Sequence, residues 1–339
     1  MKKIWLLIVL GIVALIIIGV AIFFLIKGNS RKESSTAETS SVKGDGILYL
    51  GFMSHLEGWN DDQSQERYLA HAQAVKDYAN LFEKYGGKIT FESKEFTDGE
   101  IKWGGTVLKD MEKRGHGIGV HADVGGETIE MNNFVNLIKE SKIKLESLGI
   151  TIKHISGVCS RSDWVTAASQ AGYKFITGGV AFCTQSLPVD KRPTEYTNCQ
   201  NPAACHQVFP TELKDRIHPW RMSNGNNWLE NDPNGKVVFI PSSGLLQCMA
   251  EYKTSSQSII KCSFEEDDID ASIKELEAAI ELTDKNATNT YYLANSLGEE
   301  LDNSLLEKWL VRVKTLIDQG KVQWKTTPQM YDEFVAKEG

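Results

Sequence analysis

Two short polar stretches each follow an apolar run and carry residue types that bind metals or move protons. The stretch GHGIGVHADVGG places His121 at the end of an apolar run, followed by Asp123 and two glycines. The stretch SHLEGW places His55 and Glu57 two residues apart, which puts both on one face of an extended strand. Imidazole nitrogens and carboxylate oxygens suit zinc, and a carboxylate can act as a general base. These four side chains are therefore candidates for one reactive site.

The elements around these stretches predict how they are brought together. Short apolar runs alternate with segments of helical periodicity, which is typical of parallel strands covered by helices. We expect strands at 47–53, 88–93, 116–122, 153–159, 173–179, 236–244 and 289–296, and helices at 61–85, 101–114, 132–148, 163–171, 267–282 and 305–317. A last strand and helix lie in 321–334. The predicted fold class is α/β, an irregular (β/α)7-8 barrel, whose chemistry sits at the carboxyl ends of the strands.

Residues 180–234 interrupt this alternation, and the cysteines suggest how they are held. The segment is rich in proline, lacks periodicity and is far longer than an ordinary connection. Six cysteines allow many pairings, so connectivity stays open at this stage. We favour Cys199 with Cys205 and Cys248 with Cys262, because each pair is close in sequence. Cys159 and Cys183 remain, and they follow neighbouring predicted strands.

The amino-terminal residues predict a membrane tether. Residues 4–26 carry no charged side chain and are long enough to cross a hydrocarbon core as a helix. A cleaved signal peptide is the alternative, although its apolar region is usually shorter and ends at small residues. We expect a transmembrane anchor at 1–27, a polar flexible linker at 28–45 and the barrel domain at 46–339. The even cysteine count favours a domain outside the cytoplasm, and the net charge of −8 argues against a nucleic-acid partner.

Several motifs resemble the polysaccharide deacetylase superfamily, a group of metal-dependent carbohydrate esterases on a distorted barrel. GHGIGVH resembles the motif that carries the first ligand histidine, here His121. HLEG resembles the end of the first motif and places Glu57 on the metal-binding aspartate. RSDW resembles the motif whose arginine orients the catalytic base, here Arg161, and whose aromatic residue is Trp164. The tail GKVQWKTTPQMYDEF resembles the closing strand and helix.

Three family positions carry other residue types. The base aspartate of the family falls on Leu56, its second ligand histidine on Gly125, and its acid histidine near Asn295. His55 and Asp123 are the residues that can replace the missing groups. The alternative is that the chemistry has been lost.

The resemblance implies a membrane-anchored hydrolase that removes N- or O-acetyl groups from a glycan or cell-envelope polysaccharide. A divalent metal, expected to be zinc, would be held by His55, Glu57 and His121. The predicted catalytic residues are Glu57, Asp123 and Arg161, and the predicted substrate-binding residues are Trp59, Trp164, His218 and Arg221. Two alternatives remain: a metal-free glycoside hydrolase that uses Glu57 and Asp123, and a catalytically inactive glycan-binding envelope protein.

Overall fold

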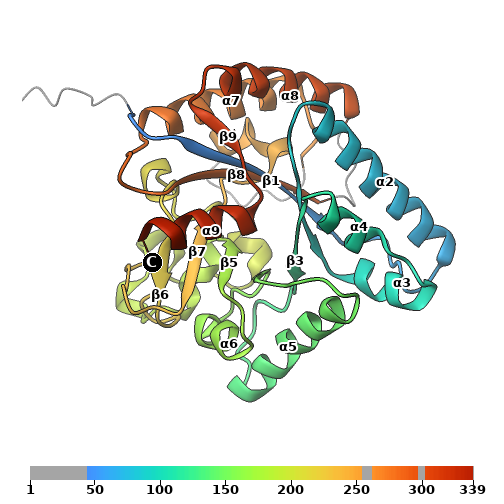
Figure 1. Cartoon of the computed structure of the whole chain (residues 1–339). Coiled ribbons are helices and arrows are strands. Elements are labelled where there is room, and N and C mark those ends of the chain that lie inside the picture. Colours follow the sequence, from blue (N-terminus) through green and yellow to red (C-terminus); the bar gives the residue numbers. More distant parts are fainter. Residues whose placement is uncertain (1–43, 254–261, 297–301, 339) are drawn as a thin grey trace, which may run out of the picture. The chain divides into compact units, whose positions relative to one another are not determined.

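The computed structural model describes residues 44–253, 262–296 and 302–338, and these fold around one parallel sheet (Figure 1). Seven parallel strands follow one another across the sheet, and most of them alternate with helices along the chain. In spatial order they are β7 (Val237–Pro241), β5 (Phe175–Gly178), β4 (His154–Ser156), β3 (Gly117–His121), β2 (Thr90–Ser93), β1 (Leu48–Leu56) and β8 (Asn289–Ser296). The α/β class and the parallel sheet agree with the sequence prediction.

The sheet curves as an open half-barrel. Among the described residues, the segment that follows β7 meets β8 through an isolated bridge between Leu245 and Ala294 and through backbone hydrogen bonds of Ser243 and Gly244. At the outer edge β6 (Trp220–Met222) pairs antiparallel with β7, and β9 (Val322–Trp324) pairs with the first three residues of β1. The sheet is therefore consistent with the predicted irregular barrel, but no continuous ladder closes it within the part of the chain described.

Alternation along β1 separates an outer from an inner core. Leu50 and Phe52 belong to the outer core, and Phe52 lies 4.7 Å from Phe82 of α2 (Gln65–Lys84), measured between ring centroids. Met53 points the other way and belongs to the inner core. Because successive strand residues face opposite sides, the odd-numbered residues of β1, His55 included, face the barrel interior.

The last helix fills one end of that interior. Met330 and Phe334 of α9 (Thr327–Glu338) pack in the inner core with Met53 and Tyr292. The amide of Thr327 donates a hydrogen bond of 2.9 Å to Oγ1 of Thr90, the first residue of β2. Apolar packing therefore occupies the amino ends of the strands, and the interior at their carboxyl ends is left for polar side chains.

The helices follow the predicted order, with one correction. They are α2, α3 (Glu95–Trp103), α4 (Val107–Lys113), α5 (Met131–Ser147), α6 (Trp164–Gln170), α7 (Glu266–Glu281), α8 (Asn303–Asp318) and α9. The single helix predicted for 101–114 is wrong, because α3 ends and α4 begins around Gly104. Gly104 has a φ of +72°, a left-handed conformation that ends a helix and favours glycine. The adjacent Gly105 extends this turn.

The interruption at 180–234 contains short 3-10 turns, and its buried residues pack into the main hydrophobic core. The turns are η1 (Ala181–Ser186), η2 (Val189–Lys191), η3 (Thr194–Tyr196), η4 (Pro202–Cys205) and η5 (Leu213–Asp215), and η6 (Leu246–Cys248) and η7 (Glu251–Lys253) follow later. Trp228 is fully buried and packs against Trp164 and Phe239. Aromatic packing therefore replaces regular periodicity here, which explains why the sequence shows no helix or strand pattern.

Three disulfides are present, and they are the three favoured pairs. Cys159 joins Cys183, Cys199 joins Cys205, and Cys248 joins Cys262. The first bond ties the segment after β4 to η1. The pairs expected from the sequence are thus confirmed in the structure.

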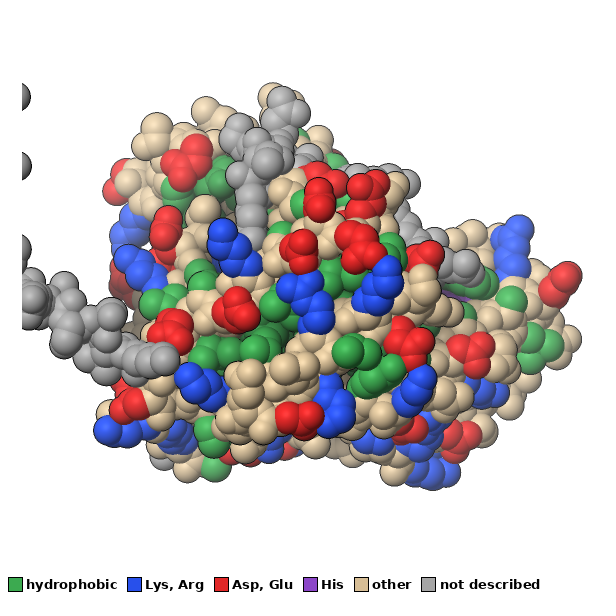
Figure 2. Space-filling view, turned by 90° about the horizontal axis from the view of Figure 1, so that it is seen from above, with side chains coloured by type: hydrophobic (Ala, Val, Ile, Leu, Met, Phe, Trp, Pro, Cys, Tyr) green, Lys and Arg blue, Asp and Glu red, His purple; other side chains and the backbone are tan. Residues whose placement is uncertain are grey.

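The surface carries interspersed charges of both signs. On the face seen in Figure 2, Lys and Arg side chains alternate with Asp and Glu. Ion pairs of Lys308 with Glu266 and of Arg312 with Asp270 join α8 to α7. These exposed pairs contribute little to stability individually.

No helix among the described residues is long and apolar enough to span a bilayer. The predicted anchor at 1–27 lies outside the described residues, as does the linker at 28–45 except for its last two residues. The anchor therefore stays a prediction.

The buried carboxyl group of Glu100 should make the stability of the protein depend on pH. Burial against α4 raises its pKa to about 7, although the Leu108 amide contacts its carboxylate. The folded protein therefore keeps this proton to higher pH than the unfolded chain does, and stability falls as pH rises from about 4.5 to about 7. Glu100→Gln removes this titration. Its stability relative to wild type should rise by up to about 3 kcal/mol between pH 5 and pH 8.

Urea unfolding at both pH values measures this difference. Glu140→Gln, a matched change at an exposed position of α5, should show no such trend. Equal pH dependence of wild type and Glu100→Gln would contradict the assignment.

Candidate active site

A cavity of about 420 Å³ opens at the carboxyl ends of the parallel strands. Its volume lies in the range of ligand-binding pockets. Much of its wall is apolar, with Val158, Phe182 and Leu245 among the lining residues. The four polar residues singled out from the sequence also line it: His55, Glu57, His121 and Asp123. The cavity therefore combines an apolar wall with a polar cluster contributed by the ends of β1 and β3.

The two histidines of this cluster are stacked. The ring centroids of His55 and His121 lie 4.1 Å apart, with 18° between the ring planes. His55 is the penultimate residue of β1, and His121 is the last residue of β3. The two strands flank β2, and parallel alignment brings their carboxyl ends to the same edge of the sheet.

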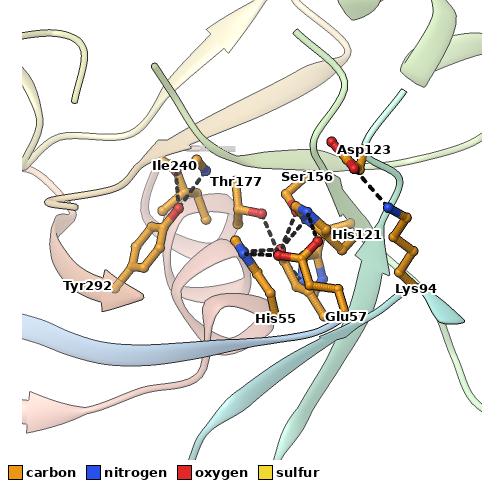
Figure 3. A network of polar contacts seen from close by, with 12 residues as sticks. His55, Glu57, Lys94, His121, Asp123, Ser156, Thr177, Ile240 and Tyr292 are labelled. Atoms are coloured by element: carbon orange, nitrogen blue, oxygen red, sulfur yellow. Dashed lines mark hydrogen bonds and ion pairs between the residues drawn. The ribbon is translucent and has the colours of Figure 1, made fainter. Parts of the chain in front are cut away.

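Each histidine lies between the same two carboxylates, Glu57 and Glu92. Figure 3 shows Glu57 beside both histidines. On the cavity side, Glu57 lies 3.9 Å from Nδ1 of His55 and 3.3 Å from Nε2 of His121. On the inner side, Glu92 lies 3.2 Å from Nε2 of His55 and 4.0 Å from Nδ1 of His121. Each imidazole therefore directs one nitrogen toward the cavity and the other toward the barrel interior.

Glu92 lies at the centre of the inner network. It belongs to β2, opposite His55 in the strand register, and its side chain is fully buried. Its Oε1 accepts a hydrogen bond of 2.5 Å from Thr177 and lies 3.1 Å from Nε2 of His154. Its Oε2 accepts a hydrogen bond from Ser156. This carboxylate thus compensates for its burial through contacts from several strands.

Sequence reasoning missed Glu92, although a signal was present. The run TFES folds as a strand whose four residues are all buried, and Glu92 is its one ionisable side chain. A carboxylate in a fully buried strand needs partners and so indicates a polar site. Gly119 provides the space, because a Cβ at this position would lie 2.1 Å from Nε2 of His154.

Both carboxylates of the cluster favour the ionised form. Burial of Glu57 opposes ionisation, but the hydrogen bond and charge of His121 outweigh it and lower the pKa to about 2. Burial also opposes ionisation of Glu92, and contacts from His154 and His55 hold its pKa well below the usual range. For His121, burial lowers the pKa, whereas Glu57 raises it, and the net shift is upward. The cluster is therefore a strong site for positive charge.

Asp123 lies at the cavity wall and pairs with a cation that the sequence analysis did not assign. Nζ of Lys94, which follows β2, lies 2.8 Å from Oδ2 of Asp123. The backbone of Asp123 is left-handed, with a φ of +47°, which short polar residues tolerate better than most. Lys94 thus holds the Asp123 carboxylate beside the histidine cluster.

Within the described part of the chain, Arg161 contacts backbone carbonyl groups and no carboxylate. Its guanidinium donates to the carbonyl oxygens of Cys199 and Gln200, at 2.8 Å and 3.0 Å, and lies over the ring of Phe182. The expected orienting role is therefore not supported, because the side chain joins the segment after β4 to the 180–234 segment. Its neighbour Trp164 is fully buried and donates to Ser186, so it cannot face a substrate.

The other predicted substrate-binding residues lie away from the cavity. Trp59 stacks on the buried His71 at 4.6 Å and borders a separate depression at the start of α2. His218 lies 3.4 Å from the carbonyl of Thr288, just before β8 begins. Arg221 lies over the ring of Phe334 in α9. None of these three is among the residues that line the cavity.

His206, which received no role from the sequence, does line the cavity. It follows η4 in the 180–234 segment, and burial is the largest cause that lowers its pKa. No sequence signal pointed to it, because the segment that carries it has no periodicity.

The donor groups fit a metal ion by distance. His55, Glu92 and His121 each offer one ligand atom, and these atoms all lie within 4.8 Å of one another. Glu57 adds a second carboxylate at the cavity side of the same two rings. Two imidazoles and one carboxylate are the protein ligands of several catalytic zinc sites.

Comparison with known proteins identifies the fold. No protein-family model and no curated protein matches the sequence. A solved structure described as a polysaccharide deacetylase from Mycobacterium smegmatis aligns with a TM-score of 0.52 and 13% identity, over 87% of this chain and 92% of that chain. One from Pseudomonas aeruginosa PAO1 aligns with a TM-score of 0.54 and 10% identity, over 84% and 90%. The chain has the polysaccharide deacetylase fold.

The deacetylase fold is shared by proteins of different chemistry. Puue allantoinase aligns with a TM-score of 0.55 and 10% identity, over 91% of this chain and 96% of that chain. At this level of identity the likeness establishes the architecture alone. The resemblance stated from the motifs is thus confirmed for the fold, and the reaction has to be argued from the side chains.

Proposed function

We propose that the domain is a metal-dependent hydrolase that removes acetyl groups from a glycan. The observation that carries this proposal is the convergence of His55, Glu57 and His121 at the cavity of a polysaccharide deacetylase fold. These three residues would hold the ion, expected to be zinc. When bound, a divalent ion polarises the acyl carbonyl and lowers the pKa of a bound water.

Glu57, rather than Glu92, is the proposed carboxylate ligand. Glu57 lines the cavity, whereas Glu92 is fully buried and is not among the lining residues. A catalytic metal needs a position open to water and substrate, and only the Glu57 side of the two rings faces one.

The remaining polar groups have separate proposed tasks. Asp123 is the carboxylate that would take a proton from the attacking water, and its ion pair with Lys94 would hold it in place. The apolar wall, with Phe182 and Leu245, would exclude bulk water from the reacting group. Lys94 thereby takes the orienting role that the motif resemblance assigned to Arg161.

Acetate release from acetylated oligosaccharides tests this proposal with the full-length protein. Turnover should stop after a chelator is added and return when zinc is restored. Chelator-resistant cleavage of the glycosidic bond would favour the glycoside hydrolase alternative instead.

A non-catalytic glycan-binding protein is the second candidate. Leu56 stands at the family's base position, and its side chain is fully buried. The usual base is therefore absent from its usual place. Retention on an immobilised glycan with no acetate release would select this candidate.

We also propose a single-pass membrane tether with the domain outside the cytoplasm. The three disulfides support this placement, because such bonds persist in oxidising compartments. Protease added to intact cells should digest the domain, and protection until lysis would exclude the placement.

A further inference from the structure

We propose that Glu92 is a positioning residue that sets the tautomers of His55 and His121, so that both present a lone pair to Glu57. The inference rests on the proposed function for the identity of the ion. The assignment of the tautomers depends only on the contacts of Glu92 with its neighbours. An ionised carboxylate can only accept hydrogen bonds, and it offers about four lone-pair sites. Every polar hydrogen directed at Glu92 must therefore come from its neighbours.

The four neighbours are divided between the two oxygens of Glu92. Thr177 and His154 approach Oε1, whereas Ser156 and His55 approach Oε2. Each oxygen of Glu92 therefore has one hydroxyl donor and one imidazole nitrogen beside it. An ion on the inner side of the cluster would have to displace one of these neighbours.

The direction of the Ser156 bond determines the tautomer of His121. Ser156 has one hydroxyl hydrogen, and it is directed to Glu92, which cannot donate. Oγ of Ser156 must then accept from Nδ1 of His121, which lies 2.7 Å away. Nδ1 of His121 therefore carries the hydrogen.

The same argument applies to His55, which contacts Glu92 directly instead of through a hydroxyl group. Its Nε2 lies 3.2 Å from Oε2 of Glu92, so that nitrogen carries the hydrogen. A neutral imidazole has only one N–H. The lone pairs are thus on Nδ1 of His55 and Nε2 of His121.

These two nitrogens are the ones that face Glu57, at 3.9 Å and 3.3 Å. When both rings are neutral, two lone pairs and a carboxylate point at one another, an arrangement that a cation between them stabilises. An outer carboxylate that fixes ligand histidines is a recognised support for metal sites. Glu92 supplies that support from β2, a strand to which the motif resemblance assigned no functional residue.

Glu92→Gln in the full-length protein tests the assignment, because the amide can donate where the carboxylate cannot. We expect zinc affinity, measured by titration calorimetry, to fall about 10–100-fold. In metal-free wild-type protein labelled with ¹⁵N-histidine, NMR at an alkaline pH where the imidazoles are neutral should show His121 protonated at Nδ1 and His55 protonated at Nε2. In the variant, His55 should lose this preference.

Glu100→Gln is the matched control, because Glu100 is also a buried carboxylate but contacts the Leu108 amide instead of a histidine. It should keep wild-type zinc affinity and tautomers. If Glu92→Gln does not fold, Ser156→Ala removes the relay and should release the tautomer of His121 alone.

The opposite tautomers in wild type, unchanged zinc affinity in Glu92→Gln, or no zinc binding by wild type would each overturn the inference. Failure of the proposed hydrolysis is distinguishable from these results. A protein that binds zinc with the expected tautomers but releases no acetate keeps the inference and loses the proposed function.

Discussion

His121→Ala should abolish metal binding and, with it, acetate release. His121 supplies one of three proposed protein ligands, and its Nε2 lies 3.3 Å from the carboxylate of Glu57. Two remaining ligands are too few to hold a zinc-like ion at a catalytic site. The loss of affinity should exceed the about 10–100-fold expected when an outer partner is removed. Elemental analysis after gel filtration, together with calorimetry, measures it.

His218→Ala is the matched control for this variant. His218 is also partly buried, but it lies beside Thr288, just before β8 begins, and does not line the cavity. It should keep its full metal content. Equal metal content in the two variants would exclude His121 as a ligand, and the glycan-binding alternative would then be favoured.

Removal of the Cys159–Cys183 disulfide should lower stability by about 3 kcal/mol. The bond closes a loop with a sequence separation of 24 residues, and cross-linking such a loop restricts the unfolded chain. It also holds the wall of the cavity, because Cys159 and Phe182 both line it. Urea unfolding of Cys159→Ser/Cys183→Ser against wild type measures the change in the free energy of unfolding.

Removal of the Cys199–Cys205 bond tests the same explanation on a shorter loop. Its sequence separation is only 6 residues, so its removal should cost less, about 2 kcal/mol. An equal or larger loss for the shorter loop would contradict the loop-entropy explanation and would indicate that local packing dominates.

The sequence by itself was sufficient for features that depend on local pattern. Apolar runs and helical periodicity predicted the parallel α/β sheet. A strand buried on both faces is continuously apolar, and a helix buried along one stripe repeats its apolar residues with the helical period. The cysteine spacing led to the three disulfides found in the structure. His55, Glu57 and His121 were placed at strand ends, and parallel strands bring such ends to one edge.

The glycine pair at Gly104 and Gly105 shows where a local signal was present but was not used. Two adjacent glycines disfavour a continuous helix, and the left-handed Gly104 separates α3 from α4. The prediction of one helix over 101–114 was therefore wrong although the signal against it, the glycine pair, is present in the local sequence.

The tertiary structure alone decided which partner each polar side chain meets. Periodicity tells which face of a strand a residue occupies, but not which residues of other strands lie opposite. That pairing depends on strand register and barrel curvature, which bring Glu92 to His55 and Lys94 to Asp123. Arg161 matched a motif, yet its guanidinium contacts carbonyl groups of Cys199 and Gln200, which lie far along the chain and are brought to it only by the tertiary fold.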